Sequence, residues 1–145
     1  MHGVIRRLVE VGIPVMAHIG LLPQSVLKDG GYRLHGKSEA EAAALLDDAQ
    51  AVQEAGAFAV VLEGMPAALG AEITARLAIP TIGIGAGPHC DGQVQVITDL
   101  LGLGGAFVPK HAKVYAPLGQ TALDGLRKYV QEVTEGNFTP GAPVG

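Results

Sequence analysis

Glu63 and His18 are the residues of this sequence best suited to proton chemistry. Glu63 follows the apolar run of VVLEGMP (60–66), at the end of an expected buried strand. A carboxylate shielded from water can take a proton from carbon, whereas a solvated glutamate would only pair with a lysine. His18 lies within the apolar run IPVMAHI (13–19). A neutral imidazole there can hydrogen-bond a substrate oxygen, or it can be a satisfied core histidine.

The glycine-rich stretch GIGAGPHCDGQ (83–93) lies where a strand should lead into a helix. It lacks the spacing of a dinucleotide fingerprint, and the chain has no Gly-Lys-Ser/Thr, so neither a Rossmann turn nor a P-loop is indicated. Its glycines are expected to let the backbone approach a ligand or a neighbouring loop. Asp91 is predicted to cap the following helix, with a role as metal or ligand contact as the alternative.

The remaining polar candidates have weaker patterns. Lys110 and His111 follow a short apolar run and would either bind an anion or be exposed, while Cys90 is predicted to be inert. A single cysteine excludes an internal disulfide, and no Cys/His cluster resembles a zinc site. The net charge of −4 and the pI near 5.6 argue against a nucleic-acid partner. No apolar run reaches the ~20 residues that span a bilayer, so a cytoplasmic protein without a membrane partner is expected.

Short apolar runs alternate with helical patterns along the chain. Strands are predicted at 13–19, 58–62, 79–84 and 106–108. The first predicted helix starts at a capping box of Ser38 and Glu41 and ends at Gly56. Further helices are predicted over 67–77, 94–101 and 118–135, and residues 4–12 are expected to complete a helix that precedes the first strand. Residues 1–145 are interpreted as one domain with an extended tail over 140–145.

This alternation predicts a parallel α/β fold, either an open doubly wound sheet or part of a (β/α)₈ TIM barrel. The candidate polar groups are all expected at the carboxyl ends of strands, where barrel enzymes carry their active sites, so the barrel is favoured. Four strands make only half of such a barrel. Two chains could also pair edge to edge, because exposed parallel edges seek partners.

Five stretches together resemble the ketopantoate hydroxymethyltransferase family. They are IPVMAHIGLLPQS, GGYRLHGKS, VVLEGMP, IPTIGIGAGPHCDGQVQV and PKHAKVYA, and they occur in the family's order. The resemblance implies a TIM barrel of the phosphoenolpyruvate/pyruvate group, of which this chain would supply about the last four βα units. The glycine-rich stretch at residues 83–93 would then be the loop after the seventh barrel strand.

The implied reaction is hydroxymethyl transfer from 5,10-methylenetetrahydrofolate to 3-methyl-2-oxobutanoate, giving 2-dehydropantoate for pantothenate and coenzyme A synthesis. By resemblance, Glu63 would be the proton acceptor and His18 a substrate-binding residue. The family uses Mg²⁺, whose ligands would lie upstream of residue 1, so none is expected in this chain. A cytoplasmic homo-oligomer, commonly a decamer, is also implied.

Two other interpretations stay open. The chain could be a truncated or split-gene product that is catalytically silent alone because the metal-binding half is absent. It could also be another enzyme of the same barrel group, such as a lyase acting on a 2-oxoacid, although the DGQ and PQS stretches fit that reading poorly.

Overall fold

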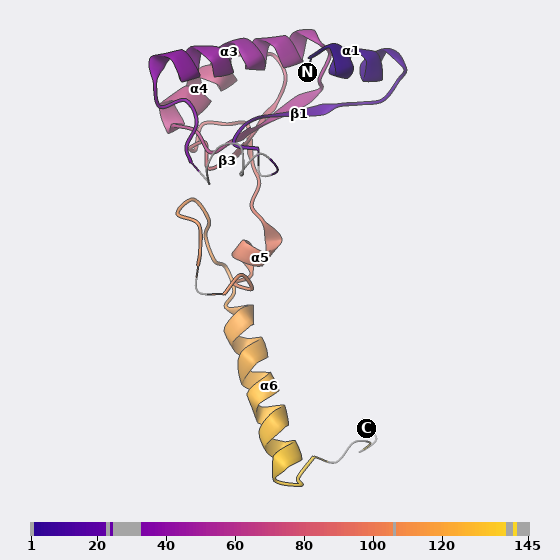
Figure 1. The fold of residues 1–145 in the computed structure, drawn as a ribbon, viewed down its shortest axis with the longest axis vertical. Coiled ribbons are helices and arrows are strands. Elements are labelled where there is room, and N and C mark those ends of the chain that lie inside the picture. Colours follow the sequence, from indigo (N-terminus) through magenta and orange to yellow (C-terminus); the bar gives the residue numbers. More distant parts are fainter. Residues whose placement is uncertain (1, 23, 25–32, 106, 139–140, 142–145) are drawn as a thin grey trace. The chain divides into compact units, whose positions relative to one another are not determined.

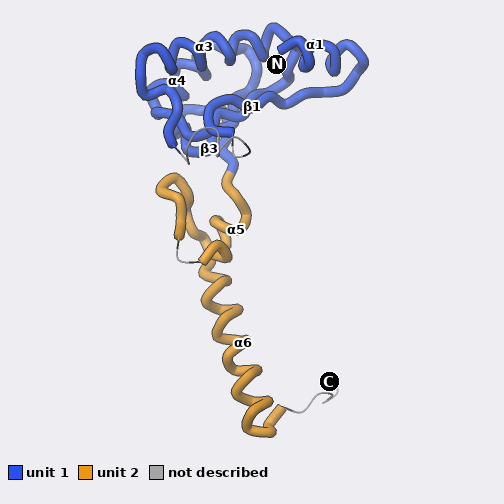
Figure 2. The backbone as a smooth tube through the Cα atoms, in the orientation of Figure 1, with its two compact units in different colours: residues 1–94 blue, residues 95–145 orange. Residues whose placement is uncertain are grey.

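The computed structural model describes residues 2–22, 24, 33–105, 107–138 and 141. The chain divides into two compact units, residues 1–94 and 95–145 (Figure 2). The single domain predicted for 1–145 stays a prediction, and the tail predicted for 140–145 lies outside the described residues except for Gly141.

The first unit alternates helices and strands. Its elements are α1 (His2–Glu10), β1 (Met16–Gly20), α3 (Glu39–Glu54), β2 (Ala59–Glu63), α4 (Ala67–Arg76), β3 (Thr81–Ile84) and β4 (Gly92–Gln93). The strands form one parallel sheet in the order β1-β2-β3-β4. A parallel sheet whose strands are joined mainly through helices confirms the predicted α/β class.

Helices α3 and α4 cover one face of this sheet (Figure 1). Side chains alternate between the two faces of a strand, so one set of residues from each strand packs under these helices. Val60, Leu62 and Ile73 are completely buried there. The other set of side chains, from His18 on β1 and Glu63 on β2, is only partly buried. The core therefore lies between sheet and helices, and the candidate site lies on the opposite face of the sheet.

The predicted helices are mostly confirmed, but the fourth predicted strand is wrong. Helices predicted over 67–77 and 118–135 are observed as α4 and α6 (Leu118–Thr134). The helix predicted over 94–101 is reduced to the short α5 (Ile97–Leu100). Of the strand predicted over 106–108, the described residues 107 and 108 are irregular and exposed. The fourth strand is β4 instead, because Gly92 and Gln93 pair with β3.

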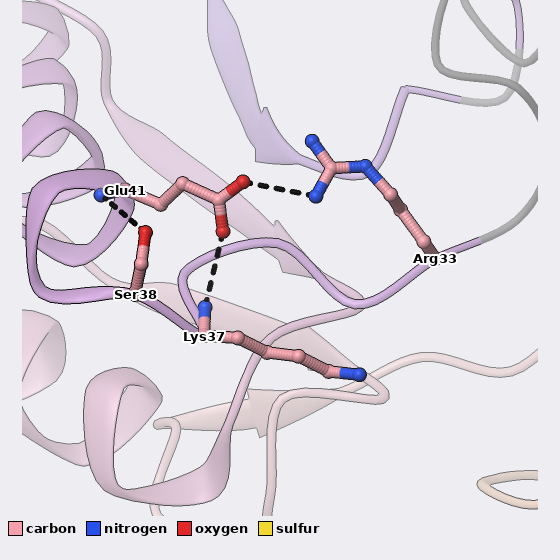
Figure 3. A network of polar contacts seen from close by, with 4 residues as sticks. All are labelled: Arg33, Lys37, Ser38 and Glu41. Atoms are coloured by element: carbon pink, nitrogen blue, oxygen red, sulfur yellow. Dashed lines mark hydrogen bonds and ion pairs between the residues drawn. The ribbon is translucent and has the colours of Figure 1, made fainter.

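Helix α3 begins at the predicted capping box (Figure 3). The Ser38 hydroxyl accepts a hydrogen bond from the Glu41 amide at 3.3 Å. The Glu41 carboxylate reaches back to the Lys37 amide at 3.2 Å and accepts from the Arg33 guanidinium at 2.9 Å. The Ser38 hydroxyl thus satisfies one amide that a helix start leaves without an intrahelical partner, and the Glu41 carboxylate secures the segment that leads into α3.

Stability is expected to fall with acid partly through Glu41. The hydrogen bond and charge of Arg33 are the main reason that the pKa of Glu41 lies below its ordinary value of 4.5. A depressed folded-state pKa gives a contribution that is complete above the unfolded pKa and is lost as pH falls through the folded one. Urea unfolding followed by circular dichroism from about pH 6 to about pH 3 should therefore show a larger loss in the wild type than in Arg33→Met. Equal losses in both proteins would contradict this assignment.

The second unit contains α5 and α6 joined by an irregular segment. Gln95 bonds twice to Lys113, its amide donating to the Lys113 carbonyl at 2.7 Å and its carbonyl accepting from the Lys113 amide at 3.1 Å. None of the described residues from 95 onward is fully buried. No helix in the described ranges is long and apolar enough to cross a bilayer.

Candidate active site

Strands β1 and β2 bring His18 and Glu63 together on the sheet face opposite α3 and α4. Gly20 is the register partner of Glu63, and His18 is that of Val61, so the two side chains are diagonal neighbours on one face. The His18 Nε2 atom lies 3.1 Å from the Glu63 carboxylate. The side chains are 34% and 16% exposed respectively. The structure thus joins the two residues that sequence reasoning had singled out separately.

The contact between them is a close approach of polar atoms. His18 Nε2 is buried and makes no hydrogen bond with any described residue, although it lies 3.1 Å from the Glu63 carboxylate. A protonated imidazole would act there as a counter-ion for Glu63, while a neutral one would leave the carboxylate free to accept a proton. A small shift of either side chain, or a bound polar group, would satisfy the nitrogen.

The backbone around Glu63 is tied on both sides. Its carbonyl accepts from the Leu21 amide at 2.8 Å, and the Gly64 amide donates to the Ile84 carbonyl at 3.0 Å. The His35 amide donates to the Gly64 carbonyl at 2.8 Å. These bonds hold the end of β2 between its two neighbouring strands and the segment that precedes α3. The glutamate side chain consequently projects from a fixed backbone position.

Gly20 is a site residue that the sequence reasoning missed. It has a φ of +94°, and a Cβ at this position would overlap the Glu63 carbonyl oxygen. Only glycine meets both conditions without strain. A glycine directly after an apolar strand was the available signal, but nothing in the sequence indicated which backbone atom would approach it.

The glycine-rich stretch packs against protein. After β3 it forms the loop 85–91, and Gly87 lies so close to Ala67 at the start of α4 that a Cβ would collide. Close approach is present at Gly87 as expected, but its neighbour is helix α4 and neither a ligand nor a neighbouring loop. The predicted capping role of Asp91 is wrong, because its carboxylate bonds to Thr81 at the start of β3 and the next helix begins at Ile97.

Contrary to expectation, Lys110 and His111 do not lie at the end of a strand. They occupy an exposed turn in the second unit, while His18 and Glu63 belong to the first. Cys90 is a free, partly buried thiol packed on the core. Neither feature adds a chemical group to the pair in the first unit.

The described residues do not fit a magnesium ion. Mg²⁺ prefers several oxygen ligands in octahedral geometry, and Glu63 is the one carboxylate of the pair. Among the described residues, no three His, Cys, Asp or Glu side chains gather closely enough to hold a metal. Any metal ligation at this face would have to include groups beyond these residues.

Comparison with known proteins identifies close relatives. The family model described as "Ketopantoate hydroxymethyltransferase" matches residues 1–141. A protein of Geobacter sulfurreducens named 3-methyl-2-oxobutanoate hydroxymethyltransferase is 58% identical over 134 residues, covering 92% of this chain and 50% of the relative. Proteins of the same name from Dehalococcoides mccartyi strain CBDB1 and Trichlorobacter lovleyi are each 56% identical, with 48% and 52% of their lengths covered. The chain thus spans about half the length of the curated relatives it matches.

Proposed function

Because the chain belongs to the ketopantoate hydroxymethyltransferase family, we propose that it takes part in hydroxymethyl transfer to 3-methyl-2-oxobutanoate. Its four-stranded parallel sheet is a partial TIM barrel, since the relatives are about twice as long. The observation that carries the proposal is the largely buried Glu63 carboxylate, 3.1 Å from His18 at the carboxyl end of β2. Active sites of barrel enzymes lie at this end of the strands.

In the proposed reaction Glu63 is the general base. It takes the single proton from C3 of the oxoacid, the carbon next to the ketone, and the electron pair of the broken C–H bond forms the enolate. That carbon then bonds to the one-carbon unit, for which 5,10-methylenetetrahydrofolate is the proposed donor. Both carbon–nitrogen bonds of this unit break with their electron pairs staying on nitrogen, and water supplies the hydroxyl group. The folate nitrogens take up the C3 proton and one proton of the water, so tetrahydrofolate leaves and 2-dehydropantoate is the product. A carboxylate positioned for such a transfer contributes typically 10²–10⁴-fold in rate.

His18 is proposed to bind a substrate oxygen. Its Nε2 is buried, lies beside the base and has no hydrogen bond among the described residues. An oxygen of the oxoacid or of the product would supply the missing partner. Buried polar atoms in native structures nearly always have a hydrogen-bond partner, so a bound substrate oxygen would satisfy His18 Nε2.

The metal and the assembly are further parts of the proposal. Mg²⁺ would be held through ligands outside the described residues, since these offer no cluster for it. The homo-oligomer implied by the family resemblance is part of the proposal as well, while the edge strand β1 of this partial barrel is where the remaining strands would pair.

Deuterium exchange at C3 tests the proposed function without the folate. The purified chain is incubated with Mg²⁺ and 3-methyl-2-oxobutanoate in D₂O, alone and with a polypeptide that carries the remaining half of a relative, and loss of the C3 proton is followed by NMR. Exchange by the chain alone or by the mixture supports the proposal. Exchange only in the mixture would identify a split enzyme, and none in either would favour the catalytically silent alternative.

A further inference from the structure

Asp91 forms a compact hydrogen-bonded clamp with Thr81. One carboxylate oxygen of Asp91, Oδ2, accepts from the Thr81 amide at 2.8 Å and from the Thr81 hydroxyl at 3.0 Å. The Asp91 amide donates to the same hydroxyl at 3.2 Å. The hydrogen bonds from the Thr81 amide and hydroxyl, in that order, lower the pKa of Asp91. Three contacts between two residues leave little freedom for either backbone.

The clamp extends to helix α4 through Thr74. The Thr81 hydroxyl is completely buried and lies 2.9 Å from the Thr74 hydroxyl, which also lies 2.8 Å from the Gly70 carbonyl. Thr81 has one hydroxyl proton, and an ionised carboxylate can only accept, so that proton goes to Asp91. Thr74 then donates its own single hydroxyl proton, which the Gly70 carbonyl and the Thr81 hydroxyl share as acceptors. The network joins α4, β3 and the residue before β4.

The loop between β3 and β4 depends on this clamp because it contains no helix. It comprises only residues 85–91, whereas parallel strands are usually joined by a dozen or more residues. The loop lies directly on its neighbours, since a Cβ at Gly83 would come within 2.9 Å of the Cys90 sulfur and one at Gly70 would overlap the Ala86 carbonyl. Asp91 fastens the far end of this loop to the beginning of β3.

The near end of the same loop supports the residues after Glu63. The Gly64 amide donates to the Ile84 carbonyl at 3.0 Å, and the Met65 amide donates to the Gly85 carbonyl at 3.2 Å. Ile84 and Gly85 are the points where β3 ends and the loop begins. A change in the loop is thereby transmitted to the backbone that carries the Glu63 side chain.

We propose that Asp91 is a positioning residue, which clamps the loop 85–91 to Thr81 and so holds the end of β2 that carries Glu63. The catalytic consequence rests on the proposed function, in which Glu63 is the base. Asp91 acts through the backbone of Ile84 and Gly85 and has no contact with the reacting atoms. Its loss should slow proton transfer more than it weakens binding of the oxoacid.

Amide hydrogen exchange measured residue by residue by NMR tests the clamp. In Asp91→Ala, the Gly64 and Met65 amides should exchange faster by on the order of tenfold, because the lost bonds are charge-assisted. The Ala42 amide, which donates to the Ser38 carbonyl in α3, should be unaffected. Asp48→Ala, which removes an exposed carboxylate of α3, is the matched control and should leave all three amides unchanged.

A second pair of variants separates positioning from a general loss of stability. Thr81→Val removes the hydroxyl and should speed amide exchange at Gly64 and Met65, as Asp91→Ala does. Thr81→Ser keeps the hydroxyl, so these two amides should exchange as slowly as in the wild type. Uniformly faster exchange that includes Ala42 would overturn the proposal, as would unchanged exchange at Gly64 and Met65 in Asp91→Ala.

The rate of C3 deuterium exchange supplies the catalytic readout. Asp91→Ala should lower kcat with KM for the oxoacid nearly unchanged, and a rise in KM alone would overturn the positioning role. If the wild type shows no C3 exchange in any mixture, the proposed function fails, and the amide protection still decides whether Asp91 holds the end of β2. The two failures are therefore distinguishable.

Discussion

Glu63→Gln is expected to lower the rate of C3 deuterium exchange by about 10²–10⁴-fold, the usual contribution of a positioned general base. Glutamine has nearly the same size and can occupy the same place beside His18, but its amide does not accept a proton at neutral pH. The fold should persist, because the hydrogen bonds that hold the end of β2, such as the one from the Leu21 amide to the Glu63 carbonyl, are made by backbone atoms. The measurement is the NMR assay of the C3 proton in the mixture that is active for the wild type.

Two companion variants make this result specific. Glu10→Gln removes an exposed carboxylate at the end of α1 and should leave the rate unchanged. Glu63→Asp keeps the carboxylate but withdraws it by one methylene, so a partial rate is expected. If Glu63→Gln retained the wild-type rate, Glu63 would not be the base, and another group would have to remove the proton.

Gly20→Ala is expected to destabilise the first unit by about 2–5 kcal/mol, from a strained positive φ and an overpacked contact. At a φ of +94° the new Cβ would overlap the Glu63 carbonyl oxygen, and the Met65 methyl lies 3.1 Å from its position. A carbonyl oxygen cannot rotate away as the end of a flexible side chain can, so the clash is relieved only by a shift of the main chain. The strain should therefore displace the end of β2 and slow C3 exchange as well. Urea unfolding followed by circular dichroism measures the first effect.

Gly12→Ala separates the two causes. Gly12 has a similar φ of +85°, but nothing lies within 4 Å of its would-be Cβ. Its substitution should cost only the conformational strain of about 1–3 kcal/mol, partly offset by the lower entropy of the unfolded chain. It should also leave C3 exchange unchanged. If both alanine variants were equally stable, close approach to the Glu63 carbonyl would not be a constraint on this fold.

Sequence reasoning succeeded where the interactions are local. The capping box of Ser38 and Glu41 lies within four residues, and the predicted hydrogen bond from the Glu41 amide to the Ser38 hydroxyl is present. The partners of such a motif are brought together by the helix itself, so no tertiary information is needed. The apolar runs at 58–62 and 79–84 likewise became β2 and β3, with ends that differ from the prediction by at most two residues.

The errors concern residues whose partners are distant in sequence. Asp91 satisfies the sequence pattern of a helix cap, yet its partner is Thr81, ten residues earlier, across the loop 85–91. Residues 106–108 are as apolar as a strand, whereas Gly92 and Gln93 have no strand propensity and still pair with β3. Strand formation there is decided by an available neighbour.

The sequence by itself determined the α/β class, the main helices, the family and the two residue types of the candidate site. Hydrophobic periodicity and short motifs carry that information, since each is complete within a short stretch of chain. Only the tertiary structure decided that His18 Nε2 lies 3.1 Å from Glu63, that Gly20 must admit the Glu63 carbonyl, and that Asp91 fastens the loop to Thr81. These distances follow from strand register and from packing between distant segments, which a single sequence does not encode in any local pattern.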